Sequence, residues 1–262
     1  MYIDRNAIRL EARGRMRDAL PKPYYEGLLY ILAAGALTVL SAVILTGKIT
    51  PESSDAYLRL VMKGNYEAAN EFFEEQLMPG GLDVFLSFVL RLFGGVVAAG
   101  LSIFAMNTLR GREASLWNLL DGFGRFFPLI LLLLLMQLLT TLWTQLFIIP
   151  GIIALYRYRL AVYLMLDNPQ LGVFPCILFS GRLMRGHKWE LFLLDLSFLG
   201  WFLLAFLPFT IASVFPGYAA PIFGGLCTGA ILAWVWPYYE MSCVGFYEAV
   251  KTPLRIEPPE EP

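Results

Sequence analysis

A long apolar stretch over residues 126–149 limits what this chain can fold into more than any other feature. It reads FFPLILLLLLMQLLTTLWTQLFII and contains no Asp, Glu, Lys or Arg. A hydrocarbon layer about 30 Å thick needs roughly 20 consecutive apolar residues in helical form. The composition agrees, because hydrophobic residues make up 58% of the chain and charged residues 16%, against about 25% in ordinary soluble domains. We therefore expect a polytopic membrane protein.

Similar stretches predict an all-α fold, a bundle of six transmembrane helices in a single domain over residues 1–262. The expected spans are residues 24–46, 82–107, 126–148, 151–167, 190–214 and 222–247. The fourth is short, and only Pro150-Gly151 separates it from the third. Because a Pro-Gly pair is a strong turn signal and proline suits the first turn of a helix, a tight hairpin is favoured over one long helix.

Basic residues are sorted along the chain, and they predict its orientation. Six precede the first expected span, three lie between spans two and three, three between spans four and five, and two follow span six, which gives fourteen. The opposite side has three, all in the first loop: Lys48, Arg59 and Lys63. Because Lys and Arg in short loops favour the cytoplasm, we expect a multi-pass membrane protein with both termini inside. Residues 1–23, which we expect to be retained, and the tail 248–262 are then cytoplasmic.

The loop between the first two spans, residues 47–81, is acidic and external in this topology. Its helical spacing over residues 55–78 predicts one or two short amphipathic helices on the outer leaflet or capping the bundle. A cation-binding or partner-binding acidic patch is the alternative. Amphipathic cytoplasmic segments at 3–20, 112–122 and 170–185 each precede a pair of spans. This pattern is typical of three parallel repeats, each made of one interfacial helix and one pair of spans. The alternative is that any helix entering a bilayer has such a segment before it.

Five ionisable residues fall inside the expected spans: Arg91, Arg157, Arg159, Asp195 and Glu240. Each costs about 2.5–3.5 kcal/mol at the centre of a membrane helix unless it finds a partner, water or the interface. At about 1.5 Å per residue, Arg159 lies at a depth from which it can pair with Asp195 or with Glu240. Arg157 and Arg159 are two positions apart, so they point to nearly opposite sides of a helix. We favour a structural role for Asp195, and a transport pathway is the alternative.

Small residues and aromatic residues indicate packing and anchoring. Gly225-Leu-Cys-Thr-Gly229 and, more loosely, Gly95-Val-Val-Ala-Ala99 have the spacing that lets helix backbones approach closely. Four aromatic residues lie where an anchoring belt at the membrane surface is expected: Trp189, Trp236, Tyr238 and Tyr239.

The sequence favours a non-enzymatic protein without cofactor or metal. It has one histidine and three widely spaced cysteines, and it lacks zinc-protease, serine-nucleophile and phosphate-loop motifs. The basic interfacial group between spans four and five, made of Arg182, Arg185, His187 and Lys188, predicts contact with anionic lipid at the cytoplasmic face. A protein partner or homo-oligomer is possible in this scheme, and nucleic acid is not an expected partner.

The second half of the chain resembles a known family. The stretch DNPQLGVFPCILFSGRLMRGHKWELFLLDLSFLGW, preceded by FIIPGIIALYRYRLAVYLM, is similar to the bacterial integral membrane family called domain of unknown function 975. The segment LRGREASLWNLLDGFGRF and the arginine-rich N-terminus agree with it. The resemblance implies a helical multi-span protein of Gram-positive-type bacteria, located in the bacterial cytoplasmic membrane, and it implies no activity.

These observations lead to two functional hypotheses. The first is a membrane-embedded interaction or envelope-homeostasis protein that uses its basic cytoplasmic helices against anionic lipid or a partner. The second is a small-solute or lipid transporter that uses the region of Arg157, Arg159, Asp195 and Glu240. A polar cavity that reaches Asp195 would favour transport, and a dry paired cluster would favour a structural role.

Overall fold

The computed structural model describes residues 4–46, 50–215 and 219–251. Among these residues there are helices and no β-strand, and six helical segments are long and apolar enough to cross a membrane. These segments are Pro23–Thr46, Gly81–Leu109, Asn118–Leu146, Ile148–Asp167, Lys188–Ala212 and Ile222–Lys251. The predicted all-α polytopic fold is confirmed. Two basic residues used in the topology prediction, Lys48 and Arg255, lie outside the described residues.

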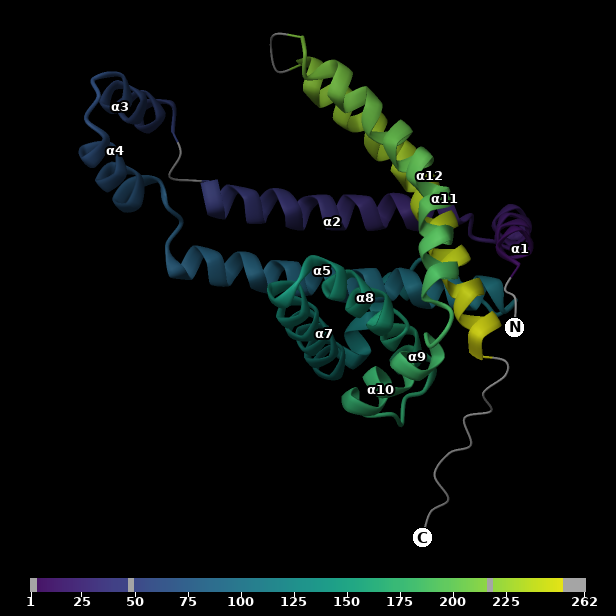
Figure 1. Ribbon diagram of the computed structural model, residues 1–262. Coiled ribbons are helices and arrows are strands. Elements are labelled where there is room, and N and C mark those ends of the chain that lie inside the picture. Colours follow the sequence, from purple (N-terminus) through teal and green to yellow (C-terminus); the bar gives the residue numbers. More distant parts are fainter. Residues whose placement is uncertain (1–3, 47–49, 216–218, 252–262) are drawn as a thin grey trace. The chain divides into compact units, whose positions relative to one another are not determined.

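The elements follow one another along the chain as Figure 1 labels them. They are α1 (Arg5–Asp18), α2 (Pro23–Thr46), α3 (Pro51–Met62), α4 (Tyr66–Phe72), the π-helical turn η1 (Phe73–Leu77), α5 (Gly81–Leu109), α6 (Asn118–Asp121), the 3-10 turn η2 (Gly122–Arg125), α7 (Phe126–Leu146), α8 (Ile148–Tyr158), α9 (Ala161–Asp167), α10 (Val173–Leu183), α11 (Lys188–Ala212) and α12 (Ala219–Lys251). Contacts divide the chain into two compact units, Met1–Leu32 with Gly95–Pro262, and Ala33–Gly94.

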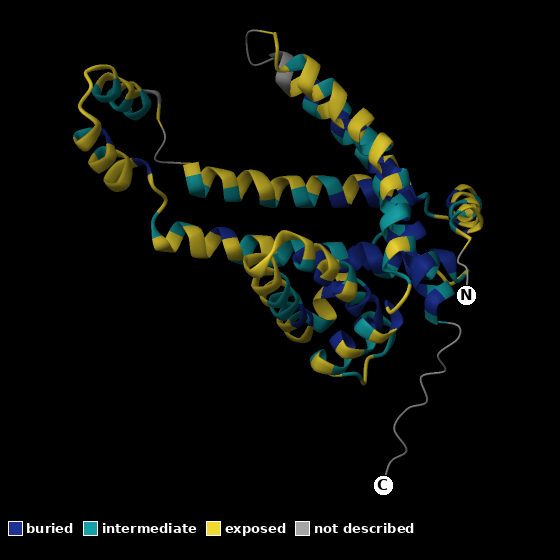
Figure 2. Ribbon diagram, viewed as in Figure 1, coloured by how far each residue is buried: buried dark blue, intermediate teal, exposed yellow. Residues whose placement is uncertain are grey.

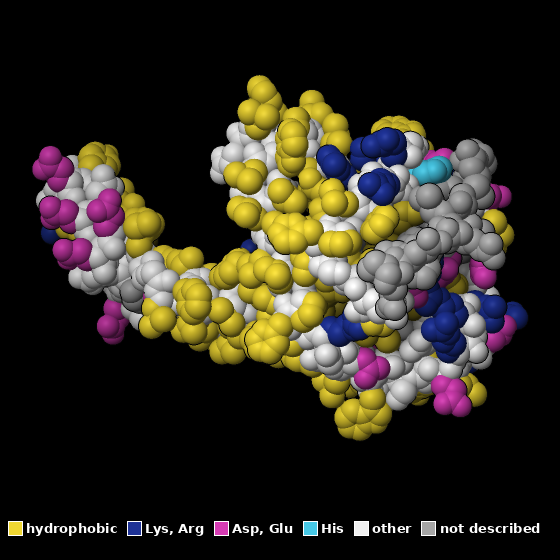
Figure 3. All heavy atoms as spheres, turned by 90° about the horizontal axis from the view of Figure 1, so that it is seen from below, with side chains coloured by type: hydrophobic (Ala, Val, Ile, Leu, Met, Phe, Trp, Pro, Cys, Tyr) yellow, Lys and Arg dark blue, Asp and Glu magenta, His cyan; other side chains and the backbone are white. Residues whose placement is uncertain are grey.

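The unit Ala33–Gly94 contains the short helices expected in the first loop. Thr50 caps α3 through a reciprocal hydrogen-bond pair with Ser53, and Gly64, with φ of 72°, ends it. Asn65 then caps α4 by accepting a hydrogen bond from the Ala68 amide. Figure 3 shows acidic side chains gathered over this α3–α4 segment. The prediction of short helices in an acidic loop is therefore confirmed.

Helix α1, in the other unit, packs along α12. Asp4 starts it by accepting hydrogen bonds from two backbone amides of the first turn. Its buried residues are Ile8, Ala12 and Met16, which repeat every four positions and so form one stripe. A Cβ on Gly245 of α12 would lie 2.9 Å from Ile8 Cγ2, so the glycine permits this close approach. The predicted amphipathic N-terminal helix is present, and its apolar stripe contacts protein.

The expected hairpin joins α7 to α8, but its turn precedes the Pro-Gly pair. Phe147 breaks the helix with an extended backbone, φ −159° and ψ 150°. Pro150 and Gly151 lie in the first turn of α8, where proline is well tolerated. A Cβ on Gly151 would collide with Thr144 of α7. Gly151 therefore serves close packing between the two helices, and the turn itself is made at Phe147.

Helices α11 and α12 form a second hairpin, and Figure 1 shows them side by side. They approach closely at Gly224, where a Cβ would lie 2.6 Å from Ala212 Cβ and 2.7 Å from the Pro208 carbonyl oxygen. The predicted close approach is absent at Gly225, where a Cβ would meet nothing within 4 Å, and at Gly229 a Cβ would lie 3.9 Å from Ile31 Cγ2 of α2, an ordinary contact distance. The approach depends on Gly224, which faces α11.

The other predicted small-residue contact is present on α5. A Cβ on Gly95 would lie 2.7 Å from Leu133 Cδ1 of α7. One turn further on, a Cβ on Gly100 would collide with the backbone of Leu119 in α6. The row of small residues on α5 therefore receives α6 and α7 at short distance.

The buried core lies where α5, α9 and α12 meet, which Figure 2 shows as a concentration of dark blue. Its fully buried side chains include Phe104, Leu164, Phe246 and Tyr247. Outside this core, large apolar side chains such as Leu32, Phe127 and Leu203 stay exposed along the long helices. Exposed apolar surface on this scale is typical of helices that contact lipid. The core therefore holds together α5, α9 and α12, the helices that carry part of the candidate site.

Candidate functional site

The fourth apolar segment separates its two arginines, as their spacing predicts. The helix is interrupted at Arg159 and Leu160, between α8 and α9. Arg159 turns into the protein toward α11 and α12, where it meets Asp195 and Tyr239. Arg157 is exposed on another side, beside Gly181 of α10. The four residues predicted to form one intramembrane cluster therefore contribute to two different sites.

Arg159 forms an ion pair with Asp195, one of the two partners that the depth estimate allows. The distance from Arg159 Nη1 to Asp195 Oδ2 is 3.5 Å, and the two side chains are 26% and 20% exposed. Tyr156 donates a hydrogen bond to Asp195 Oδ2 at 3.0 Å, and Tyr239 donates one to Oδ1 at 2.9 Å. Arg159 Nη2 also donates to the Tyr239 hydroxyl. Asp195 is thus neutralised and satisfied by groups from α8, α11 and α12.

Glu240 is held by neutral donors. Its Oε1 accepts hydrogen bonds from Ser102 Oγ at 2.6 Å and from Tyr163 Oη at 2.9 Å. Among the described residues, no cation lies within ion-pair distance of Glu240. The alternative pairing of Arg159 with Glu240 is therefore not formed.

The tyrosines that complete both sites were not expected from the sequence. Tyr239 was predicted to anchor at the membrane surface, and instead its hydroxyl bonds Asp195 inside the protein. Tyr238, expected in the same belt, is 6% exposed. A usable signal exists for the other two tyrosines, because Tyr156, Arg159 and Tyr163 follow the i, i+3, i+7 spacing of one helix face.

A cavity of about 440 Å³ lies beside this cluster. Its lining includes Arg159 and Glu240, together with Gln137 and Thr140 of α7. Asp195 is not among the lining residues. The cavity therefore reaches the cluster at Arg159 and Glu240, while Asp195 lies behind the guanidinium that neutralises it.

A second concavity is basic and lies between α8, α10 and the start of α11. It has a volume of about 300 Å³ and is lined by Arg157, Arg182, Arg185 and Lys188 together with two uncharged residues. We call these four cations the basic pocket. Within the described part of the chain, none of them forms an ion pair. The arrangement brings four positive charges together without an acidic neighbour in the lining.

The local sequence explains how the basic pocket forms. Gly181 leaves room for Arg157, because a Cβ there would lie 3.0 Å from Arg157 Nε. Gly186, with φ of 90°, makes the turn that leads from α10 into α11. His187, predicted to belong to the basic group, is instead paired with Glu190 at 2.6 Å. Figure 3 shows this single histidine beside a group of Lys and Arg side chains.

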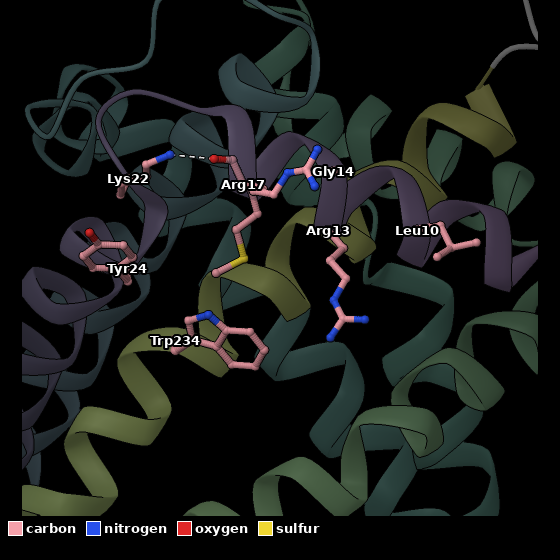
Figure 4. Close-up of a pocket in the computed structure, with 8 residues that line it drawn as sticks. Leu10, Arg13, Gly14, Arg17, Lys22, Tyr24 and Trp234 are labelled. Carbon is pink, nitrogen blue, oxygen red and sulfur yellow. Dashed lines mark hydrogen bonds between the residues drawn. The ribbon is translucent and has the colours of Figure 1, made fainter.

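A third concavity, of about 640 Å³, lies between α1, the start of α2 and α12. Figure 4 shows the basic side chains of Arg13, Arg17 and Lys22 around it, with Trp234 contributed by α12. Lys22 Nζ donates a hydrogen bond to the Arg17 carbonyl oxygen at 2.5 Å. This concavity combines cations with aromatic surface, a composition typical of the boundary between headgroups and hydrocarbon.

Two further charged features were missed by the sequence analysis. Asp167 accepts from Arg110 Nη1 at 2.7 Å and from the Tyr247 hydroxyl at 3.0 Å, and it also pairs with Lys251. This ion cluster ties the ends of α5, α9 and α12 together. Glu26 of α2 is fully buried, and among the described residues neither of its carboxylate oxygens has a hydrogen-bond partner. No local pattern in the sequence distinguishes it from a glutamate at a helix start.

Comparison with known proteins gives one family and no relatives. Residues 146–253 match the family described as "Protein of unknown function (DUF975)". The resemblance predicted from the sequence is thereby confirmed over this stretch, which contains the basic pocket and the Arg159–Asp195 pair. Neither the curated proteins nor the solved structures give a match.

Proposed function

We propose that this membrane protein, which matches a family of unknown function over residues 146–253, is non-enzymatic and acts by binding anionic lipid headgroups at the cytoplasmic face of a bacterial cell membrane. The observation that carries the proposal is the basic pocket, in which four cations share about 300 Å³ without an ion-pair partner among the described residues. Like charges held this close repel one another, so an anion that enters relieves the repulsion. A phosphate with several oxygens suits a ring of arginines.

The distribution of charge along the chain supports the location of the pocket. Arg182, Arg185 and Lys188 lie in a short connection between two apolar helices, on the side that the positive-inside rule assigns to the cytoplasm. That surface of a bacterial membrane carries anionic lipid, and each Lys or Arg near it gains about 1 kcal/mol. The concavity at Arg13, Arg17 and Lys22 offers a second contact on the same proposed side.

A lipid titration tests the proposal. The protein, purified in dodecylmaltoside, is titrated with phosphatidylglycerol or phosphatidylcholine, and bound lipid is counted by native mass spectrometry. We expect selective binding of phosphatidylglycerol that weakens with added salt. The double variant Arg182→Gln/Arg185→Gln should lose about 2 kcal/mol of binding free energy, or roughly thirtyfold in affinity.

The first loop offers a matched control for that titration. The double variant Arg59→Gln/Lys63→Gln removes two exposed basic residues from α3 and the turn after it. We expect its affinity for phosphatidylglycerol to equal that of the wild type. Equal loss in both double variants, or equal binding of both lipids, contradicts the proposal. The same spectra report any second copy of the chain or co-purified protein partner.

A small-solute or lipid transporter is the second candidate, and its support is the cavity lined by Arg159 and Glu240, which does not include Asp195 in its lining. Charged groups that line a cavity between membrane helices are often part of a transport pathway. The experiment is uptake into proteoliposomes with the Glu240→Gln variant as comparison. Uptake that is lost in this variant, while folded yield stays normal, supports transport.

A further inference from the structure

The 440 Å³ cavity has one carboxylate oxygen that is free to meet a ligand. Both hydrogen bonds to Glu240, from Ser102 and from Tyr163, end on Oε1. Oε2 has no hydrogen-bond partner among the described residues, and it keeps some solvent-accessible surface. Glu240 lines the cavity, so the open space beside this carboxylate is the cavity. The two donors therefore hold the carboxylate in place and leave one of its oxygens open.

The charges around this cavity do not cancel. Arg159 is paired with Asp195, while Glu240 has no cationic partner within the described residues. With each group counted at its formal charge, one cation stands against two carboxylates, and the carboxylate without a cationic partner is Glu240, on the side of the cavity. An uncompensated charge between membrane helices is costly unless a counter-ion or water reaches it. A ligand of positive charge meets this requirement.

Aromatic rings form the wall near the free carboxylate. Tyr30 of α2 and Trp236 of α12 stack with ring centroids 5.6 Å apart, and both line the cavity. Tyrosine and tryptophan rings attract ammonium groups through their electron-rich faces, and tryptophan does so most strongly. A carboxylate beside such rings favours an organic ammonium over a small inorganic cation, because the ammonium brings apolar surface that the rings can cover.

We propose that this cavity is a binding site for an ammonium group, carried by a small solute or by the headgroup of an aminolipid. Glu240 Oε2 is the counter-ion, and Tyr30 and Trp236 contact the alkyl surface around the nitrogen. Arg159 and Gln137, which line the same cavity, can contact an oxygen of the ligand. The proposal is independent of the basic pocket. It shares its cavity with the transport candidate, but binding requires no transport.

Binding of choline to the purified protein tests the inference. The protein in dodecylmaltoside is titrated calorimetrically with choline chloride, with its uncharged isostere 3,3-dimethylbutan-1-ol, and with sodium chloride. We expect choline to bind, the isostere to bind roughly tenfold more weakly or not at all, and sodium chloride to give no saturable heat. Equal binding of choline and the isostere overturns the proposal, and so does the absence of choline and aminolipid binding.

Two variants locate the site. Glu240→Gln keeps an acceptor for Ser102 and Tyr163 and removes the charge, so it should fold and lose at least roughly tenfold in affinity. Trp236→Leu should weaken choline binding in a protein whose carboxylate is intact. The control is Glu71→Gln, on the exposed side of α4, which should bind as the wild type does. Wild-type affinity in both Glu240→Gln and Trp236→Leu overturns the assignment.

The source of the ammonium is distinguished in nanodiscs. Choline binding is measured in discs of phosphatidylglycerol alone and in discs that also contain phosphatidylethanolamine. Competition by phosphatidylethanolamine identifies an aminolipid as the ligand, and unchanged choline binding identifies a free solute. Because the basic-pocket variant Arg182→Gln/Arg185→Gln should bind choline normally, failure of one proposal is distinguishable from failure of the other.

Discussion

Asp195 illustrates how a carboxylate is accommodated among apolar helices. Its two oxygens receive hydroxyl groups from Tyr156 and Tyr239, and its charge faces the Arg159 guanidinium. Hydrogen bonds to charged groups contribute more than those between neutral groups, and each is costly to leave unmade in a low-dielectric setting. Asp195 therefore links α11 to α8 and α12, as expected for the structural role that the sequence analysis favours.

Replacing Asp195 with Asn removes the charge while keeping an acceptor for the tyrosines. Arg159 then loses its counter-charge, and breaking a buried pair in this way destabilises a protein by about 3 kcal/mol. We expect a lower folded yield and a lower midpoint of thermal unfolding, both measured by fluorescence-detected size-exclusion chromatography. Glu190→Gln, which breaks the pair with His187 at the start of α11, is the control and should behave nearly as the wild type. Normal yield and midpoint in Asp195→Asn contradict the prediction.

Cys176 of α10 should react only slowly with thiol reagents in the folded protein. The side chain is fully buried, and burial raises the pKa of its thiol to about 11, although Arg125 opposes the shift. Because the thiolate is the reactive form, the fraction available at pH 8 is small and rises with pH. In a variant that keeps only this cysteine, Ellman's reagent should react slowly at about pH 8 and fast after denaturation in SDS. Fast reaction of the folded variant would show that the thiol is accessible.

The directions of some charged side chains could be predicted from their spacing along a helix alone. The positions of Arg157 and Arg159 required them to point apart, and the structure places them in different sites. The hydroxyl partners of Asp195 and Glu240 come from α5, α8, α9 and α12 and meet only after folding. The spacing of Tyr156 and Tyr163 from Arg159 predicts a shared helix face, but it does not identify the carboxylates that these tyrosines meet. The same holds for Glu26, which is buried at the start of α2, where a Cβ on its neighbour Gly27 would collide with Ala233 of α12.

At the scale of elements, apolar length and turn residues predicted most helix boundaries. The spans expected at 24–46 and 82–107 correspond closely to α2 and α5. The prediction did not include the break of the fourth span at Arg159 and Leu160. It also did not identify Gly224 as the glycine that meets α11, because a Gly-xxx-Gly spacing says nothing about which face of a helix meets its neighbour.

Gly100 and Gly35 form a matched pair that tests close packing. A Cβ on Gly100 would collide with the Leu119 backbone, whereas one on Gly35 of α2 would meet nothing within 4 Å. Gly100→Ala should therefore destabilise the protein by about 1–3 kcal/mol through overpacking. Gly35→Ala should leave stability unchanged or raise it by up to about 1 kcal/mol, because alanine favours the helix. Thermal unfolding in detergent measures both, and equal midpoints would contradict the contact.

At the scale of the whole molecule, the unequal distribution of Lys and Arg along the chain predicts an even number of membrane crossings, and the number of long apolar helices is compatible with this topology. Six apolar segments allow an even number of crossings, which places α1, α10 and the end of α12 on the same proposed side. The number of spans and the fold class followed from apolar length. The separation into two compact units did not, because it depends on contacts between residues distant in sequence.

Accessibility of single cysteines on intact cells tests this topology. In a background without the three native cysteines, Lys63→Cys lies in the turn between α3 and α4, and Lys188→Cys lies at the start of α11. We expect an impermeant sulfonated maleimide to label the first on intact cells and the second only after lysis. Labelling of Lys188→Cys on intact cells would reverse the orientation and remove the basis for the proposed lipid contact.

The ion cluster around Asp167 has a practical consequence for any shortened version of the chain. Hydrophobicity alone suggests that the last crossing ends near residue 247, yet α12 continues to Lys251, which shares Asp167 with Arg110. A clone that stops before Lys251 would remove one of the two cations and leave the carboxylate half-neutralised. Reporter fusions and C-terminal deletions should therefore begin downstream of Lys251.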